Sequence, residues 1–329
     1  MPGMAAKCPD CGADCRLGVA PAGMPFSCKG CGRQFRLSPE GAAPAGIPIA
    51  DPVVPGAYPG AGRRARARGG HAGAGASLRH IPETRVPEIG MVLVRVPVGV
   101  YRRGSETGYP CERPVHVVRL TRPFWIGKYP VTQEVYARVM GHNPSYCRGP
   151  ARPVDSVSWR DCVEFCRRLT VLYRESGSGL ARMMFRLPTE AEWEHACMLP
   201  GDPAVDEGQA SARDYCFGSD RQKLDAYAWY AQNSGGTSHP VGAKAPNALG
   251  LYDMHGNVGE WCQDWFSAYR SGAFTDPSGP SAGRQKVRRG GGWASVARRC
   301  RATDRIGVLP HCRSGLIGFR VVMVEETGA

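Results

Sequence analysis

The sequence predicts an α+β domain with little regular secondary structure, preceded by a small metal-binding segment. The 43 Gly and 28 Pro interrupt the chain too often for long helices. In a chain of 329 residues, a 42% share of hydrophobic residues still suffices for a sizeable core. Helical periodicity is confined to two or three short stretches, and other apolar runs alternate as strands do. Together these features favour short strands joined by long loops.

The first segment, residues 1–37, contains two CxxC pairs with sixteen residues between them. This spacing is typical of a zinc ribbon, in which four thiolates surround one Zn²⁺ ion tetrahedrally. Such a site can fold a segment that is too short for its own core. A redox pair or free thiols are the alternatives. The predicted zinc ligands are Cys8, Cys11, Cys28 and Cys31.

Residues 38–84 are rich in Pro, Ala and Gly and show no hydrophobic period, which predicts a flexible linker. A basic run within it is interpreted as a solvated stretch that keeps the linker extended. The alternative is that this run and the ribbon contact protein, nucleic acid or a membrane surface. The net charge of +13 favours anionic partners only weakly, because part of it lies in this run. The run comprises Arg63, Arg64, Arg66 and Arg68.

Neither a membrane span nor a signal peptide is expected. No apolar run approaches the roughly 18 residues of a membrane span. The N-terminal sequence MPGMAAKCPDC lacks the apolar stretch of a signal peptide. We therefore expect a cytoplasmic protein, in which the 14 cysteines stay reduced or bind metal rather than form disulfides.

The main domain, residues 85–329, opens with alternating residues over 91–105 that predict a strand pair. Strands and bends continue over 111–132. A short helix is expected to start at Thr132 and to stop at Gly141.

Two capping boxes predict further helix starts. The first is Ser158 with Asp161, and the helix after it carries an apolar stripe that includes Cys162 and Cys166. This i, i+4 cysteine pair could hold a metal, but without a third ligand nearby a buried stripe is the favoured interpretation.

The second capping box is Thr189 with Glu192, and it predicts another short helix. Arg186 precedes this helix start. It is expected to pair there with Glu190 or Glu194, in a structural role.

The most informative segment of the main domain is GLYDMHGNVGEWCQDW, residues 250–265. Gly256-Asn257 separates two apolar runs and predicts a tight turn. Asp253 and Glu260 place carboxylates on both sides of that turn, with backbone carbonyls between them. Oxygen ligands of this kind suit calcium. The alternative is a hairpin with solvated acids and core tryptophans.

This segment resembles the signature GLYDMxGNVWEW of the formylglycine-generating enzyme superfamily, also called sulfatase-modifying factors. KYPVT, RLPTEAEW, HPVG and the closing GFR follow the family order between about residues 90 and 324. The resemblance implies a variant of the C-type lectin fold. It also implies a calcium ion held by Asp253, Gly256, Val258 and Glu260, the middle two through backbone oxygen.

The resemblance further implies a copper(I) ion held by two cysteines that lie five residues apart. Here Ser295 occupies the first position and Cys300 the second. A hydroxyl group cannot replace a thiolate for Cu(I), so neither copper nor formylglycine generation is expected. Gly259 also stands where most members have an aromatic residue, which removes a wall of the cleft. If the protein were an enzyme, Cys300 would be the catalytic residue, with Trp261 and Trp293 shaping its cleft.

Other relatives are non-heme iron enzymes that use three histidines. No pair of the eight histidines here has an HxxxH spacing. The iron site is thus not apparent in the sequence, and metal-dependent oxidation is kept only as the alternative function. The scattered histidines are His116, His195, His239, His255 and His311.

The segment 294–317 lies between GGGW and GFR and contains no Lys, Glu, Gln, Met or Trp. By average residue usage this has a chance on the order of one in a hundred. A diversified AAY codon cannot encode these residue types, so the segment resembles the variable region of retroelement-diversified proteins. This favours binding of a protein or small ligand. The predicted recognition residues are Ser295, Val296, Arg298, Arg299, Thr303, Asp304, Ile306, Val308, Leu309, His311, Arg313 and Leu316.

Overall fold

The computed structural model describes residues 81–177, 182–199 and 213–326, together with the backbone of four short strands near the N-terminus. These strands form two antiparallel pairs, β1 with β2 and β3 with β4. Their bounds are Ala5–Lys7, Asp14–Arg16, Phe26–Ser27 and Gln34–Phe35. The four predicted zinc ligands and the basic run of the linker lie outside the described residues.

The main domain is mostly β, with few helices. Its largest sheet has five strands in the order β10-β18-β9-β6-β5. The first of these in the chain begins at Glu83, inside the stretch predicted as linker, because it pairs with β6. The bounds are Glu83–Val86 (β5), Met91–Val96 (β6), Phe124–Gly127 (β9), Met183–Arg186 (β10) and Val322–Glu325 (β18).

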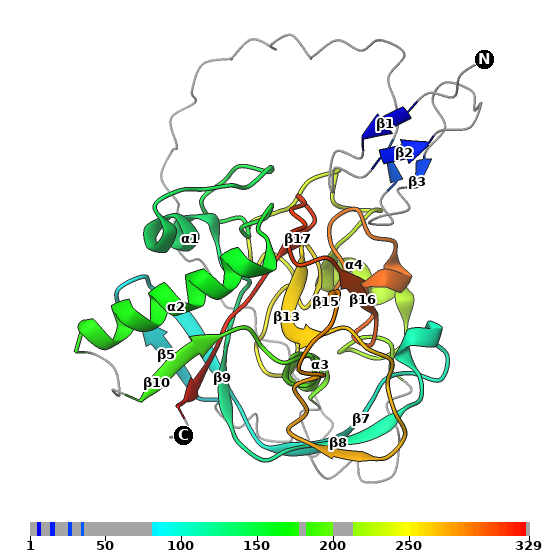
Figure 1. The fold of residues 1–329 in the computed structure, drawn as a ribbon, viewed down its shortest axis with the longest axis horizontal. Coiled ribbons are helices and arrows are strands. Elements are labelled where there is room, and N and C mark those ends of the chain that lie inside the picture. The colour runs from blue at the N-terminus through cyan, green and yellow to red at the C-terminus, as the bar shows by residue number, and fades with distance from the viewer. Residues whose placement is uncertain are drawn as a thin grey trace, which may run out of the picture. The chain divides into compact units, whose positions relative to one another are not determined.

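A three-stranded sheet, in the order β14-β8-β7, corrects the predicted strand pair over 91–105. Residues 91–96 and 99–103 are both strands, but they belong to different sheets and do not pair with each other. The proline and valine between them let the chain leave one sheet for the next, and Figure 1 shows β7 and β8 side by side. The bounds are Gly99–Arg103 (β7), His116–Leu120 (β8) and Ala273–Thr275 (β14).

A four-stranded sheet, in the order β16-β15-β13-β17, carries the C-terminal part of the domain. Antiparallel β13 and β15 lie next to each other at its centre (Figure 1). The bounds are Gly259–Trp265 (β13), Lys286–Arg289 (β15), Arg305–Val308 (β16) and Ile317–Gly318 (β17). A further parallel pair joins Ala228–Trp229 (β11) to His255–Gly256 (β12).

The helices start where the sequence predicts them. The Thr132 side chain accepts a hydrogen bond from the third helical residue of α1, and Gly141 ends that helix at φ +81°. Both capping boxes form, at Ser158 for α2 and at Thr189 for α3. The bounds are Gln133–Met140 (α1), Trp159–Glu175 (α2), Glu190–Met198 (α3) and Leu224–Tyr227 (α4), with 3₁₀ turns at Pro110–Glu112 (η1), Arg221–Lys223 (η3) and Ala297–Cys300 (η4). None of the described helices is long and apolar enough to cross a membrane.

Helix α2 packs its apolar face on β10 and on the central strands (Figure 1). Cys162 and Cys166 lie inside this core, as the buried-stripe interpretation predicts. The predicted partner of Arg186 is wrong. Its guanidinium binds Glu192 with two contacts of 2.7 Å, because the capping box holds the Glu192 carboxylate beside it.

The turn at Gly256 and Asn257 is confirmed, with φ values of +77° and +57°. It does not close a hairpin, because β12 pairs with β11 whereas β13 pairs with β15 and β17. The flanking acids are not solvated either. Asp253 is 3% exposed and Glu260 is fully buried. The hairpin alternative is therefore wrong at this segment.

Candidate functional site

The segment 294–317 begins with a tight turn that uses the Ser295 side chain. The backbone NH of Gly292 donates to the Ser295 Oγ at 2.9 Å, and the Ser295 NH donates back to the Gly292 carbonyl at 2.8 Å. The Ser295 carbonyl accepts from Ala231 at 2.9 Å. The Ser295 hydroxyl, which stands where the family has its first copper-binding cysteine, therefore stabilises a loop.

Cys300 ends the 3₁₀ turn η4 and is fully buried. It packs in a small apolar cluster with Tyr215, Leu224 and Tyr230. Burial raises the pKa of its thiol to about 12, so the thiol is protonated at neutral pH. Copper(I) prefers two soft sulfur ligands, and the partner position of Cys300 holds a serine hydroxyl. The residues present do not fit a copper ion.

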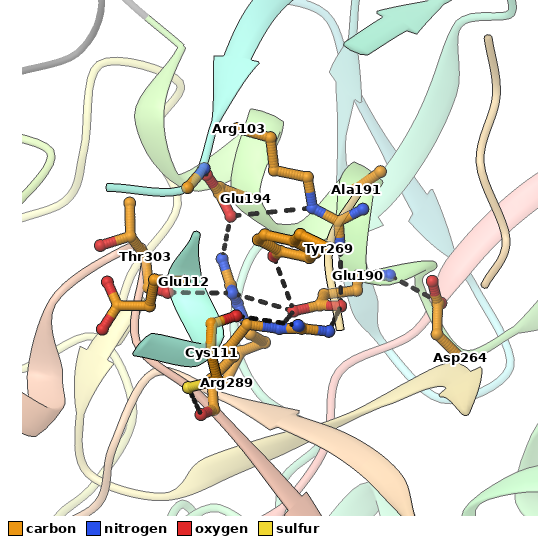
Figure 2. A network of polar contacts seen from close by, with 12 residues as sticks. Arg103, Cys111, Glu112, Glu190, Ala191, Glu194, Asp264, Tyr269, Arg289 and Thr303 are labelled. Atoms are coloured by element: carbon orange, nitrogen blue, oxygen red, sulfur yellow. Dashed lines mark hydrogen bonds and ion pairs between the residues drawn. The ribbon is translucent and has the colours of Figure 1, made fainter. Parts of the chain in front are cut away.

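A network of buried arginines and glutamates lies beneath the segment (Figure 2). Arg289, on β15, is 1% exposed and binds two of the three glutamates of helix α3, Glu190 at 3.0 Å and Glu194. Arg103 adds a contact of 2.6 Å to Glu190. These cations hold the pKa of Glu190 well below its usual range despite its burial. The network joins three elements that lie far apart in the sequence.

The same network holds the centre of the segment. Arg305 binds Glu190 through two hydrogen bonds of 2.7 and 2.8 Å. Arg301 binds Glu112, on the 3₁₀ turn η1, in the same bidentate manner at 2.9 and 2.5 Å. Arg289 also donates to the backbone carbonyls of Ala302 and Thr303. Bidentate, buried pairs fix both position and direction, so residues 301–305 form a rigid base.

Two of the predicted recognition residues belong to this base. Thr303 and Asp304 are each 2% exposed, so they do not face solvent. The Thr303 hydroxyl accepts from Arg301 at 3.0 Å, and the Asp304 carboxylate accepts from Arg299 at 3.2 Å. The prediction that these two side chains present a ligand surface needs correction, because both are occupied inside the protein.

The other predicted residues lie at or near the surface on either side of the base. Val296 is 56% exposed, which is unusual for an aliphatic side chain of this size. Arg298, His311 and Arg313 are also exposed. The half-buried members are Ser295, Arg299, Ile306, Val308, Leu309 and Leu316.

Sequence reasoning missed two residues that lie beside this surface. The half-buried Tyr109 ring lies beneath Arg299 and Arg298, whose guanidinium carbons are 4.0 and 4.5 Å from its centroid. Arg288, on β15, extends along the backbone of Gly259, and a Cβ there would lie 2.8 Å from its Cδ. The arginine side chain thus occupies space beside the position at which the family has an aromatic residue. In the sequence, Gly259 in place of the aromatic residue was the signal that another side chain could lie there.

The predicted calcium ligands are close together in a left-handed stretch of backbone. Asp253, at φ +57°, accepts hydrogen bonds from the Gly242 NH at 2.8 Å and the Asn257 side chain at 3.1 Å. It forms no ion pair with any residue that the structure describes, and burial raises its pKa to about 6. Glu260 instead binds Arg320 through two hydrogen bonds of 2.7 and 2.8 Å. A cation would satisfy Asp253 but would have to share Glu260 with this arginine.

The predicted cleft tryptophans differ in position. Trp261 is fully buried and donates to the Val157 carbonyl at 3.0 Å, so it belongs to the core. Trp293 is half-buried and donates to the Gly315 carbonyl at 2.7 Å. Tyr146, 76% exposed, packs against the same glycine.

The histidines do not converge. In the part of the chain that is described, no group of three or more His, Cys, Asp or Glu side chains could hold a metal ion. Burial lowers the pKa of His195 and of His255 to about 4, which keeps both rings neutral. Five of the described rings lie within hydrogen-bond distance of a backbone carbonyl, namely His116, His142, His195, His239 and His255.

Comparisons with known proteins identify the family of the main domain. The family profile described as "Sulfatase-modifying factor enzyme 1-like domain" matches residues 80–324. The chain is similar to the formylglycine-generating enzyme of Streptomyces coelicolor, with 30% identity over 69% of this chain and 87% of that protein. It is also similar to chaperone protein LppX of Paenibacillus barcinonensis, with 32% identity over 52% of this chain and 70% of that protein.

Among solved structures, variable protein 1 of Treponema denticola is similar at a TM-score of 0.64 and 29% identity. The match covers 74% of this chain and 98% of that protein. The similarity thus includes a protein named as an enzyme and a protein named as variable.

Proposed function

The chain belongs to the sulfatase-modifying factor enzyme 1-like family, and from this premise we propose that it binds a protein or small ligand through residues 294–317. The rigid base carries the proposal. Arg301 and Arg305 tie residues 301–305 to buried glutamates, while Val296, Arg298 and His311 on either side of the base remain exposed. A fixed frame that presents variable side chains lowers the entropic cost of binding.

The similarity to the Treponema variable protein supports this choice. A retroelement-diversified origin of the segment is part of the proposal, because its residue usage suits diversified AAY codons. A reverse transcriptase gene beside this gene, with an adenine-altered template copy, would support that origin. A neighbourhood without either would count against it.

Peptide display can test the binding function directly. Random peptides would be selected on the immobilised full chain and then measured against two double variants. Replacing Val296 and His311 by serine should weaken the selected peptides at least tenfold, because exposed anchor side chains carry much of the binding free energy. The matched control replaces Val163 and His142, which are also exposed but lie elsewhere. Equal weakening by both variants would contradict the proposal.

Metal-dependent oxidation is the second candidate, since a formylglycine-generating enzyme is among the relatives. The full burial of Cys300 and the loop-forming Ser295 speak against it. The test is to load the chain with Cu(I), add a CxPxR peptide and look for the aldehyde by mass spectrometry. We expect none, also in the Ser295→Cys variant, because Cys300 remains buried. Aldehyde formation by the native chain would overturn the preference for binding.

We also propose that a calcium ion supports the turn at Gly256. The buried Asp253 carboxylate without a cationic partner favours this, and the ligands would be Asp253, Gly256, Val258 and Glu260. The ion would have a structural role, fixing the backbone from which β13 starts. The zinc ribbon, the flexible linker and a cytoplasmic location stay predictions.

A further inference from the structure

The arginines around segment 294–317 outnumber the acids that could neutralise them. The segment contains five arginines and a single acid, Asp304. Three of the arginines have an acid elsewhere in the domain. These pairs are Arg301 with Glu112, Arg305 with Glu190, and Arg313 with Asp161. Arg298 and Arg299 remain, and Arg288 on the neighbouring strand joins them.

Arg288 is the least satisfied of these side chains. It is half-buried, and its Nε atom is buried without a hydrogen-bond partner among the described residues. Asp304 and Arg299 are both within electrostatic reach of it. Asp304 already accepts a hydrogen bond from Arg299, so one buried carboxylate serves two guanidinium groups. A half-buried guanidinium without its own acceptor is costly unless something else supplies the acceptor.

Arg298 is linked to this group through the Tyr109 ring that it shares with Arg299. It is exposed, forms no ion pair with a described residue, and stacks over Tyr109 beside Arg299. This stacking holds the guanidinium groups in place without neutralising them. We name Arg288, Arg298 and Arg299, with Tyr109, the arginine surface. Of its three guanidinium groups, only that of Arg299 forms an ion pair with a described acid.

The neighbours of the arginine surface are apolar. Val296 is 56% exposed, and Ile306 pairs with Arg288 across the strands. Leu316 is half-buried, and its carbonyl accepts from Gly259, beside Arg288. A ligand that matches this surface carries an acidic group next to aliphatic groups, and a peptide offers that combination. A nucleic acid fits less well, because three guanidinium groups already lie over the Tyr109 ring that could stack on a base.

We propose that the ligand of this segment is a peptide segment of a partner protein whose Asp or Glu carboxylate binds Arg288, with Arg298 and Arg299 beside it. This inference rests on the proposed binding function and specifies its ligand. Guanidinium and carboxylate groups match in a planar, bidentate geometry, which gives the arginine surface its selectivity. Aliphatic residues next to the acid pack on Val296 and Leu316.

The test extends the peptide selection. Peptides retained by the full chain should be enriched in Asp and Glu over the starting library. Replacing the acid of a selected peptide by its amide, Glu→Gln, should weaken binding at least tenfold, since it removes a charge-assisted hydrogen bond. The double variant Arg288→Gln, Arg298→Gln should weaken the parent peptide to the same degree and should no longer distinguish it from the amide peptide.

The control variant Arg270→Gln, Arg284→Gln removes the same charge from two exposed arginines outside the surface. Its affinity should stay within about twofold, because distant surface charges are screened. Thermal unfolding of both variants checks that they fold. Arginine ¹⁵Nε spectra of the labelled chain provide a second readout, in which the acidic peptide should shift the Arg288 resonance and its amide twin should not.

The outcomes separate the two proposals. Selected peptides that depend on Val296 and His311 but show no acidic enrichment would leave the binding function intact and overturn the carboxylate inference. A selection that yields no peptide dependent on Val296 and His311 would overturn both. Tighter, Arg288-dependent binding of a single-stranded DNA 20-mer or of inorganic phosphate would show that a phosphate group is the ligand instead.

Discussion

Replacing Glu190 by glutamine removes the central carboxylate of the buried network and leaves its cations behind. Its two oxygens contact Arg305 at 2.7 and 2.8 Å, Arg289 at 3.0 Å and Arg103 at 2.6 Å. The exposed fraction of each of these four side chains is 5% or less. In the native chain, Glu190 and Glu194 together pair with these three guanidinium groups. In the variant, Arg103 and Arg289 keep Glu194, whereas Arg305 loses its one ion pair with a described residue.

Removing one partner of a buried ion pair costs roughly 3–5 kcal/mol, because the remaining charge stays desolvated. For a domain of this size, 1 kcal/mol lowers the melting temperature by about 2–4 °C. We therefore expect Glu190→Gln to lower it by roughly 6–20 °C. Urea unfolding of the full chain, followed by tryptophan fluorescence, measures the change in the free energy of unfolding.

Glu164→Gln is the matched control. Its carboxylate also binds two arginines, Arg167 at 2.8 Å and Arg168 at 2.7 Å, but all three side chains are at least 34% exposed. Exposed pairs of this kind contribute little to stability, because water screens them. If the two variants lost equal stability, or if Glu190→Gln lost less than about 1 kcal/mol, our account of the buried network would be refuted.

The pH dependence gives a further check on the same variant. The pKa of Glu190 is lowered in the folded state, so its stabilising effect is present above the pKa of the unfolded chain, about 4.3. That effect is lost progressively as the pH falls from this value toward the lower folded-state pKa, because the unfolded chain takes up the proton first. The difference in unfolding free energy between native chain and variant should therefore shrink between pH 5 and pH 2.

Three further predictions follow from other buried groups. Burial raises the pKa of Asp264 to about 6, above the unfolded value of about 3.9, so its ionisation destabilises the fold as the pH rises from 4 to 6. Asp264→Asn should therefore gain up to about 3 kcal/mol relative to the native chain between pH 4 and pH 7.5 in urea unfolding, and a constant difference would contradict this. Cys300 should resist iodoacetamide at pH 8 in the folded chain and react in urea, as peptide mass spectrometry would report, because its pKa is about 12. Calcium at 1 mM should raise the melting temperature of the native chain, EDTA should reverse this, and Asp253→Asn should abolish the effect whereas the exposed Asp220→Asn should not; an unchanged native chain would argue against the calcium proposal.

The helix starts could be predicted because their signals are local. A capping box needs two side chains three residues apart, so Ser158 with Asp161 and Thr189 with Glu192 are visible in the sequence. The left-handed turn at Gly256 is local in the same sense. The family resemblance rests on such short motifs, and the matched residues 80–324 agree with it.

The contacts that build the candidate site could not be predicted, because their partners are far apart in the chain. Glu112 and Arg301 are 189 residues apart, and neither stands in a motif that names the other. The alternation over 91–105 identified both strands, but a period of two residues cannot show which sheet a strand joins. The burial of Thr303 was missed for a related reason, since a short hydroxyl residue in an irregular segment gives no periodic signal.

Arg289 holds segment 294–317 in a way that leaves its side chains free to change during evolution. It donates to the main-chain oxygens of Ala302 and Thr303, which every amino acid carries. Mutations at these two codons therefore leave the attachment points in place, provided that the new side chains fit the available volume. A lineage can exchange the outward-facing residues nearby and still inherit the same loop path.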